Sequence, residues 1–230
     1  MFLSPIVYLS LIENRSVKGG TVSAAATEPP VDRRARRREE KFARILHEAW
    51  ALARRDGLAA ISLRELADRV DLRQPSLYAY FESKLDLYDA MFAQAYRVIV
   101  DRFRAMPAAD DPRDQFVEMV RLSVQVASED IVRHQLLFQR TIPGFEPSDA
   151  SMAIAYELYD FGSDIMRRAG LTTQAHFDMA TAVMAGLAHQ QVANDPGGDR
   201  WERLAEPTVD LLLASVRAKP GRPTKKGSTR

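Results

Sequence analysis

A short stretch of the chain, RQPSLYAYFESK at residues 73–84, concentrates side chains that can exchange hydrogen bonds with a polar partner. It supplies a guanidinium, an amide, hydroxyl groups and an ammonium group in close succession. Pro75 stands where the first turn of a helix would lie, a position at which the missing N–H costs little. Leu77 and Phe81, four residues apart, would point inward. The stretch therefore predicts a helix that offers polar groups along its open side.

The residues just before this stretch predict a second helix that would position it. Ser62 and Glu65 have the spacing of a capping box, and Ile61 can form a hydrophobic staple with Leu66. Apolar residues then recur at helical spacing until Asp71, where a turn of three or four residues follows. Two short helices joined by such a turn, the second rich in polar groups, are typical of a helix-turn-helix that binds DNA in the major groove.

The same residues resemble the DNA-binding domain of TetR-family transcriptional regulators, over roughly residues 36–95. The resemblance is carried by the run from Gln74 to Phe81 followed by Ser83-Lys84-Leu85. The residues that match the usual sequence pattern of the family are Leu77, Tyr78, Phe81 and Lys84.

Three positions depart from the usual sequence pattern of the family. Asp71 stands where the family prefers Gly, but Asp tolerates a left-handed φ better than most residues. Tyr80 stands where the family frequently has His, and its hydroxyl can still form a hydrogen bond with a phosphate. Arg73 stands where a small capping residue is common, so we expect weaker capping and one extra cation facing DNA.

The helix-turn-helix reading assigns DNA-binding roles to individual side chains. Base-edge contacts are expected from Gln74, Pro75 and Ser76, with Arg64 from the preceding helix able to reach a guanine. Phosphate contacts are expected from Tyr78, Tyr80 and Lys84. Ser83 with Asp86 is expected to cap the next helix, so that Lys84 lies beside its positive end. The full predicted DNA-binding set is Arg64, Arg73, Gln74, Pro75, Ser76, Tyr78, Tyr80 and Lys84.

No comparable pattern points to catalysis. The chain has no Gly-rich phosphate loop, no nucleophile elbow and no paired-carboxylate signature. It has no Cys, which excludes disulfides, thiolate metal sites and a Cys nucleophile. Its four histidines are scattered, without a metal-ligand pair on one helix face. We expect no enzyme activity, no metal and no cofactor.

Charge is strongly segregated along the chain although the net charge is only +1. Residues 31–85 carry 13 basic and 9 acidic groups, whereas residues 86–216 carry 11 basic and 20 acidic groups. Residues 217–230 carry 6 basic and no acidic groups. A basic head, an acidic body and a basic tail indicate one region built for phosphate. The absence of an apolar run of about 20 residues predicts no membrane span, and we expect a cytoplasmic protein.

The predicted fold is all-α, an N-terminal three-helix helix-turn-helix domain followed by a C-terminal helical ligand-binding and dimerisation domain. The first helix of the head carries an apolar stripe from Phe42 to Ala53 and ends at Gly57. The arginines at 33–38 are expected to form a basic arm along DNA, as homeodomain arms do, with a solvated leader as the alternative. The expected divisions are 1–30, a disordered extension; 31–85, the DNA-binding domain; 86–217, the regulatory and dimerisation domain; and 218–230, a basic disordered tail.

The tail contains Gly-Arg-Pro within residues 219–226, flanked by lysines, which resembles the core of an AT-hook. Proline on both sides would hold the backbone extended for a narrow minor groove. The alternative, a disordered solubilising tail, is the one we prefer, since the Arg before the Gly is missing.

Methionine and aromatic residues are frequent in the body at helical spacing. Such residues usually form core, but Met and aromatic side chains also adapt to an apolar ligand. The predicted ligand-pocket residues are Phe92, Tyr96, Phe103, Phe116, Met119, His134, Phe138, Tyr156, Tyr159 and His176.

The TetR resemblance also implies a homodimer built from the last two helices of each chain, which would place two recognition helices on a palindromic double-stranded operator. The alternative is that these residues only pack inside one chain. The predicted interface residues are Met179, Val183, Gly186, Leu187, Gln190, Trp201, Leu204, Val209, Leu212 and Leu213.

The sequence thus predicts a TetR-type transcriptional regulator, a repressor released by a small apolar ligand. Two alternatives stay open. One is a DNA-binding dimer without a small-molecule ligand, and the other is a small-molecule-binding or enzymatic helical protein whose helix-turn-helix is incidental.

Overall fold

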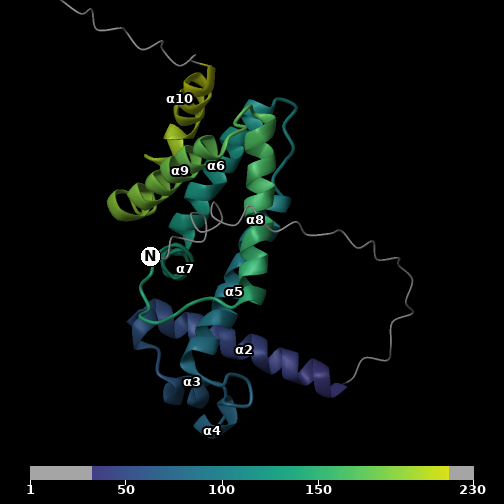
Figure 1. The fold of residues 1–230 in the computed structure, drawn as a ribbon. Helices are drawn as coiled ribbons and strands as arrows, with labels where there is room; N and C mark the ends of the chain where they lie inside the picture. The colour runs from purple at the N-terminus through teal and green to yellow at the C-terminus, as the bar shows by residue number, and fades with distance from the viewer. Residues whose placement is uncertain (1–32, 218–230) are drawn as a thin grey trace, which may run out of the picture. The chain divides into compact units, whose positions relative to one another are not determined.

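The computed structural model describes residues 33–217, and the predicted extension at 1–30, Asp32 and the tail at 218–230 lie outside that range. The described residues are all helical in architecture, with no strand among them. Figure 1 follows the chain from purple to yellow. The elements are α2 (Arg33–Asp56), η2 (Leu58–Ala60), α3 (Leu63–Arg69), α4 (Gln74–Leu77), α5 (Lys84–Arg104), α6 (Pro112–Glu129), α7 (Ile131–Phe138), α8 (Asp149–Arg168), α9 (Gln174–Asn194), η3 (Glu202–Leu204) and α10 (Ala205–Arg217).

The helices form two compact units. One comprises the described residues up to Ala105 together with Val126–Asp160, and the other comprises Met106–Gln125 together with the described residues from Phe161 onward. We call these the head unit and the tail-side unit. Helices α6 and α8 contribute residues to both units.

The head unit is built on the apolar stripe of α2. Ile45, Leu46, Ala49 and Trp50 are buried, as the periodicity predicts. Gly57 follows α2 with φ of 89°, a left-handed value suited to glycine, and its N–H donates to the Ala53 carbonyl at 2.9 Å. The sequence-predicted end of this helix is therefore confirmed.

The second helix of the helix-turn-helix is shorter than the sequence predicts. Helix α4 covers only Gln74–Leu77. The N–H groups of Ala79 and Tyr80 donate to carbonyls three residues back, at 3.3 and 2.9 Å, so the chain tightens into 3₁₀-type turns. Leu77 and Phe81 are nevertheless both buried, as predicted, and Phe81 stacks on Phe42 with ring centroids 5.3 Å apart.

Helix α5 begins at a complete capping box. The Ser83 hydroxyl accepts from the Asp86 N–H at 3.1 Å, and the Asp86 carboxylate accepts from the Ser83 N–H at 2.9 Å. Both orphan donors are thus satisfied at the point where α5 leaves the helix-turn-helix. The predicted cap is confirmed.

The tail-side unit packs α9 against α10, with a 3₁₀ turn between them. Its core includes Phe116, Met119 and Val120 from α6 and Val209 from α10, all almost fully buried. The last helix begins at Ala205, after a turn and the short η3.

Candidate nucleic-acid interface

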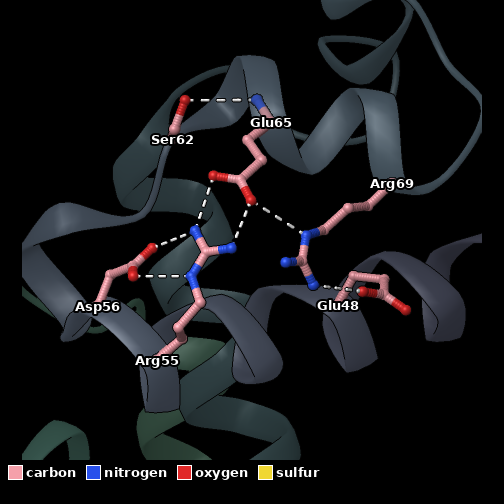
Figure 2. A network of polar contacts seen from close by, with 6 residues as sticks. All are labelled: Glu48, Arg55, Asp56, Ser62, Glu65 and Arg69. Atoms are coloured by element: carbon pink, nitrogen blue, oxygen red, sulfur yellow. Dashed lines mark hydrogen bonds and ion pairs between the residues drawn. The ribbon is translucent and has the colours of Figure 1, made fainter.

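Helix α3 starts at an N-cap of which only half matches the expected capping box. The Ser62 hydroxyl accepts from the Glu65 N–H at 3.3 Å. The Glu65 carboxylate turns instead to Arg55, whose two nitrogens lie 2.8 and 2.9 Å away, and to Arg69 at 3.3 Å. Figure 2 shows this arrangement. Charge-assisted bonds to two guanidinium groups are stronger than a bond to one backbone N–H. This explains why the Glu65 carboxylate binds Arg55 and Arg69 and not the Ser62 N–H.

The same carboxylate belongs to a polar network that joins α2 to α3 (Figure 2). Arg55 also pairs with Asp56, and Arg69 reaches Glu48 at 3.3 Å. The hydrogen bonds from Arg55 hold the pKa of Glu65 below its usual range. Since the groups are largely exposed, each pair contributes little alone, but together they orient α3 on α2.

The residues predicted to meet base edges are all accessible. Gln74, Pro75 and Ser76 are exposed at the start of α4, and Arg64 is exposed on α3; Arg73, predicted as an extra cation facing DNA, is exposed as well. The Arg73 side chain makes no capping bond to α4, as its residue type predicts. These side chains are free to turn toward a groove.

The residues predicted to hold phosphates are less uniform. Tyr78 is 48% exposed. Tyr80 is half-buried beneath Arg38, whose guanidinium carbon lies 5.7 Å from the ring centroid. Lys84 donates to the Ala59 carbonyl at 2.8 Å and lies 5.7 Å above the Tyr88 ring, and partial burial lowers its pKa. An ammonium group has three donors, so Lys84 keeps donors for a phosphate.

The turn between α3 and α4 depends on Asp71. Its φ is 56°, the one positive value among the described non-glycine residues. The Leu72 N–H then reaches back to the Ala67 carbonyl at 2.9 Å. The left-handed conformation predicted from the resemblance is therefore confirmed.

A row of cations on α2 was missed by sequence reasoning. Lys41 donates to the Val70 carbonyl at 2.8 Å, Arg44 donates to the Arg69 carbonyl at 3.2 Å, and Arg38 donates to the Ala79 carbonyl at 3.2 Å. Their spacing of three residues puts them on one helix face. That spacing is the signal in the sequence from which the row could have been found.

The expected basic arm is part of this helix. Residues 33–38 are already helical and exposed, so the described arginines extend α2 instead of forming a separate arm. Five arginines in two turns still give this end of α2 a strong positive charge.

The comparisons with known proteins agree with this geometry. Residues 45–91, which span the helix-turn-helix, match the family described as bacterial regulatory proteins, tetR family. The HTH-type transcriptional repressor KstR of Rhodococcus jostii (strain RHA1) is 30% identical over 130 residues, 56% of this chain and 59% of that protein. The crystal structure of a regulatory protein named SCO4313 is 25% identical, with a TM-score of 0.63 over 80% of this chain and all of that one.

Over these residues the chain resembles the TetR family.

A further solved structure shares the fold at lower identity. FadR from Bacillus subtilis, crystallised in complex with stearoyl-CoA, is 14% identical, with a TM-score of 0.61 over 75% of this chain and 98% of that one. The match to KstR spans less than two thirds of that relative's length.

The predicted pocket residues fall into both units. Phe92, Tyr96, His134 and Phe138 form one cluster in the head unit: the Tyr96 ring lies 4.8 Å from Phe92 and 6.0 Å from Phe138, and His134 lies 5.2 Å from Phe138, all between centroids. The head unit also holds Phe103, Tyr156 and Tyr159, and the tail-side unit holds Phe116, Met119 and His176.

Tyr96 differs from its neighbours in one respect. Its side chain is 1% exposed, and its hydroxyl has no hydrogen-bond partner within residues 33–217. Burial raises the pKa of this phenol. A buried hydroxyl without a partner costs about 1–3 kcal/mol, so a hydrogen-bonding group beside it would be stabilising.

His176, one of the predicted pocket residues, has a structural role at the start of α9. It is the N3 residue of α9, and its Nδ1 accepts from the N–H groups of Thr172 and Thr173 at 3.2 and 3.3 Å. It therefore completes a capping box in which an imidazole takes the place of a carboxylate.

The predicted dimer residues divide by burial. Leu187, Val209, Leu212 and Leu213 are buried within the chain. The exposed members are Met179, Val183, Gly186 and Leu204. Gln190 and Trp201 are half-buried, and Leu211, which the sequence analysis did not include, is 71% exposed.

Gln191 organises the turn between α9 and α10, another role that sequence reasoning missed. It is 1% exposed; its amide nitrogen donates to the Gly198 carbonyl at 3.0 Å, and its oxygen accepts from the Trp201 N–H at 2.9 Å. A Cβ at Gly198 would collide with the Asp195 carboxylate. A polar residue on an apolar helix face was the only signal for this role.

Two classes of site are absent from the part of the chain that the structure describes. No group of three or more His, Asp or Glu side chains there could hold a metal ion. None of its helices is both long and apolar enough to cross a lipid bilayer.

Proposed function

We propose that this chain is a TetR-type, sequence-specific DNA-binding repressor that acts as a homodimer and is released by a small, largely apolar ligand. The observation that carries the proposal is the exposed polar surface of α4, Gln74 and Ser76 above all, held on a head fixed by charged contacts to α2. Such an arrangement can present hydrogen-bonding groups to base edges while cations neutralise phosphates.

DNA binding can be tested without knowing the operator. Selection from a random duplex library should recover a palindrome, and binding to it should weaken steeply with salt as counterions are released. If the selection enriched no sequence over the starting random library, the proposal would be contradicted. KstR, named as a transcriptional repressor, supports repression as the direction of control.

Dimerisation is supported by an exposed apolar face on α9 and α10. Met179 is 44% exposed, Val183 38% and Leu211 71%, and Ala182 and Gly186 would let a second helix approach closely. Several exposed apolar residues on two helices that pack together are typical of an association surface. Two protomers would place their recognition helices about 34 Å apart, one turn of DNA.

Sedimentation tests the dimer directly. The wild-type chain should sediment as a dimer at micromolar concentration, and Leu211→Glu combined with Val183→Glu should produce a folded monomer. Val98→Glu, a matched change at an exposed apolar residue of α5, should leave the dimer intact. A monomeric wild-type chain would contradict this part of the proposal.

Ligand response is supported by the Tyr96 cluster. It combines aromatic walls with one buried hydroxyl that lacks a partner among the described residues. A largely apolar ligand with one hydrogen-bonding group would suit it. Bacillus subtilis FadR, of the same fold, was crystallised with stearoyl-CoA, which makes a long acyl chain a reasonable first probe.

The probe experiment has three arms. Stearoyl-CoA, stearate and coenzyme A are each titrated into the protein–DNA complex. Release by the first two would point to the acyl chain, and release by stearoyl-CoA alone would require both parts. If none of these, nor a broader set of apolar compounds, released DNA, the ligand-free dimer would replace this reading.

A further inference from the structure

The end of α3 is held by cations that come from α2. The last carbonyls of a helix lack partners within the helix. Here the Val70 carbonyl accepts from the Lys41 ammonium at 2.8 Å, and the Arg69 carbonyl accepts from the Arg44 guanidinium at 3.2 Å. Positive groups suit a helix C-terminus, where the backbone carries partial negative charge.

The charge of Asp71 makes this support more necessary. An aspartate directly after α3 adds a full negative charge beside carbonyls that are already negative, which is unfavourable. Arg44 lies 2.9 Å from the Asp71 carboxylate and offsets that charge. Both side chains are largely exposed, so the ion pair alone contributes little. The partly buried Lys41 contact is expected to contribute more.

The same face of α2 reaches the other side of α4. Arg38 donates to the Ala79 carbonyl at 3.2 Å and covers the Tyr80 ring. Helix α4 has only four residues and no side-chain cap at Arg73. Its direction is therefore set largely from outside, by contacts before Asp71 and after Leu77.

We propose that Lys41 and Arg44, aided by Arg38, are positioning residues for DNA recognition: they hold the Asp71 turn and thereby aim α4 at the base edges. Their donors point into the protein at backbone carbonyls. The proposal differs from the ordinary role of basic residues in a DNA-binding head, which is to bind phosphate. It rests on the proposed DNA binding of the chain.

The two roles predict different binding behaviour. Loss of a phosphate contact weakens all duplexes alike and lowers the salt slope by about 0.9. Loss of a positioning contact should misalign α4, so that the selected duplex suffers more than a random one. One hydrogen bond from a charged donor corresponds to about a tenfold change in an equilibrium constant.

The decisive variant is Lys41→Met, which keeps the length of the side chain and removes the donor. We expect the ratio of selected to random duplex binding to fall about tenfold, with the salt slope unchanged. Lys41→Arg should restore the ratio. Arg97→Met is the matched control: Arg97 is exposed on α5, away from the predicted DNA-binding residues, so its loss should leave the ratio unchanged.

A second measurement does not need DNA. The Leu72 N–H donates to Ala67 at 2.9 Å and the Ser76 N–H to Arg73 at 2.8 Å, so both amides report on the turn. Their hydrogen exchange should be faster in Lys41→Met, in full-length protein, and unchanged in Arg97→Met. Asp71→Gly, which suits φ of 56° and removes the charge, should lessen the effect of Arg44→Gln on the same amides.

The outcomes separate this inference from the proposed function. If the wild-type chain selects no duplex, the function fails, and the exchange data still decide whether Lys41 and Arg44 hold the turn. If Lys41→Met lowers the salt slope by about one unit and weakens both duplexes equally, Lys41 is a phosphate ligand and the inference is wrong. Unchanged exchange and an unchanged binding ratio would also overturn it.

Discussion

The indole N–H of Trp50 in α2 donates to the side-chain oxygen of Gln94 in α5 at 2.8 Å. Trp50 is 3% exposed, so its N–H depends on this one acceptor. The bond ties the middle of α5 to α2, the first helix of the head unit. The hydroxyl of Tyr88 adds a second tie, since it donates to the Leu58 carbonyl at 2.5 Å. Helix α5 is therefore tied to α2 and to η2 within the head unit.

Gln94→Leu should destabilise the protein by about 1–3 kcal/mol, because it leaves the Trp50 N–H buried without an acceptor. Gln94→Glu is the matched control, since a carboxylate still accepts the bond. The measurement is urea unfolding followed by tryptophan fluorescence. Equal stability of Gln94→Leu and wild type would contradict the importance of this bond.

Stability at alkaline pH should depend on Tyr88. Burial raises the pKa of Tyr88 from 10.0 to about 12, so above pH 10 the folded chain holds a proton that the unfolded chain releases. The free energy of unfolding should therefore be fully supported below pH 10 and decline as pH rises toward 12. Tyr88→Phe should lower stability at neutral pH. It should also make the free energy of unfolding fall less steeply between pH 10 and 12, by up to the slope that one titrating proton produces. A wild-type stability that stayed level from pH 10 to 12 would refute the account.

Arg64 and Lys84 should respond differently to mutation. Arg64→Ala should cost about 1–3 kcal/mol and relax base preference at one position of each half-site. Lys84→Met should weaken all sequences alike and lower the salt slope by about one unit. Binding isotherms on single-base variants of the selected duplex at several salt concentrations measure both effects. A change of base preference in Lys84→Met would mean that the roles are wrongly assigned.

Gln191→Leu should destabilise the tail-side unit by about 2–4 kcal/mol, because it leaves the Gly198 carbonyl and the Trp201 N–H without their partner. Gln190→Leu, one residue earlier, removes only a bond to Asn194 and should change stability by less than about 0.5 kcal/mol. Urea unfolding of both variants makes the comparison. Similar losses in the two would show that Gln191 has no special place in the turn.

The sequence predicted the elements of the head well because each has a strong local signal. The stripe on α2, Pro75 in the first turn of α4 and the Ser83–Asp86 box are patterns within a few residues. Exposure of Gln74 and Ser76 followed from the inward spacing of Leu77 and Phe81.

The contacts that could not be predicted from the sequence join residues that are far apart along the chain. Lys41 and Val70 are 29 positions apart, and Lys84 and Ala59 are 25 apart. No spacing rule connects a cation to a backbone carbonyl in another helix. The Glu65 carboxylate was misassigned for the same reason: its local partner at Ser62 lost to Arg55 and Arg69, which only the packed structure brings near.

Binding of wild-type protein and an Arg64→Ala, Gln74→Ala double variant to the selected duplex, across a range of salt concentrations, tests the central claim most directly. The account predicts that wild type prefers this duplex to a random one of equal length by at least about a thousandfold. It also predicts that the double variant loses most of that preference while keeping the salt slope. Equal binding of wild type to both duplexes, or a double variant with undiminished preference, would contradict the claim that this head recognises DNA sequence through α3 and α4.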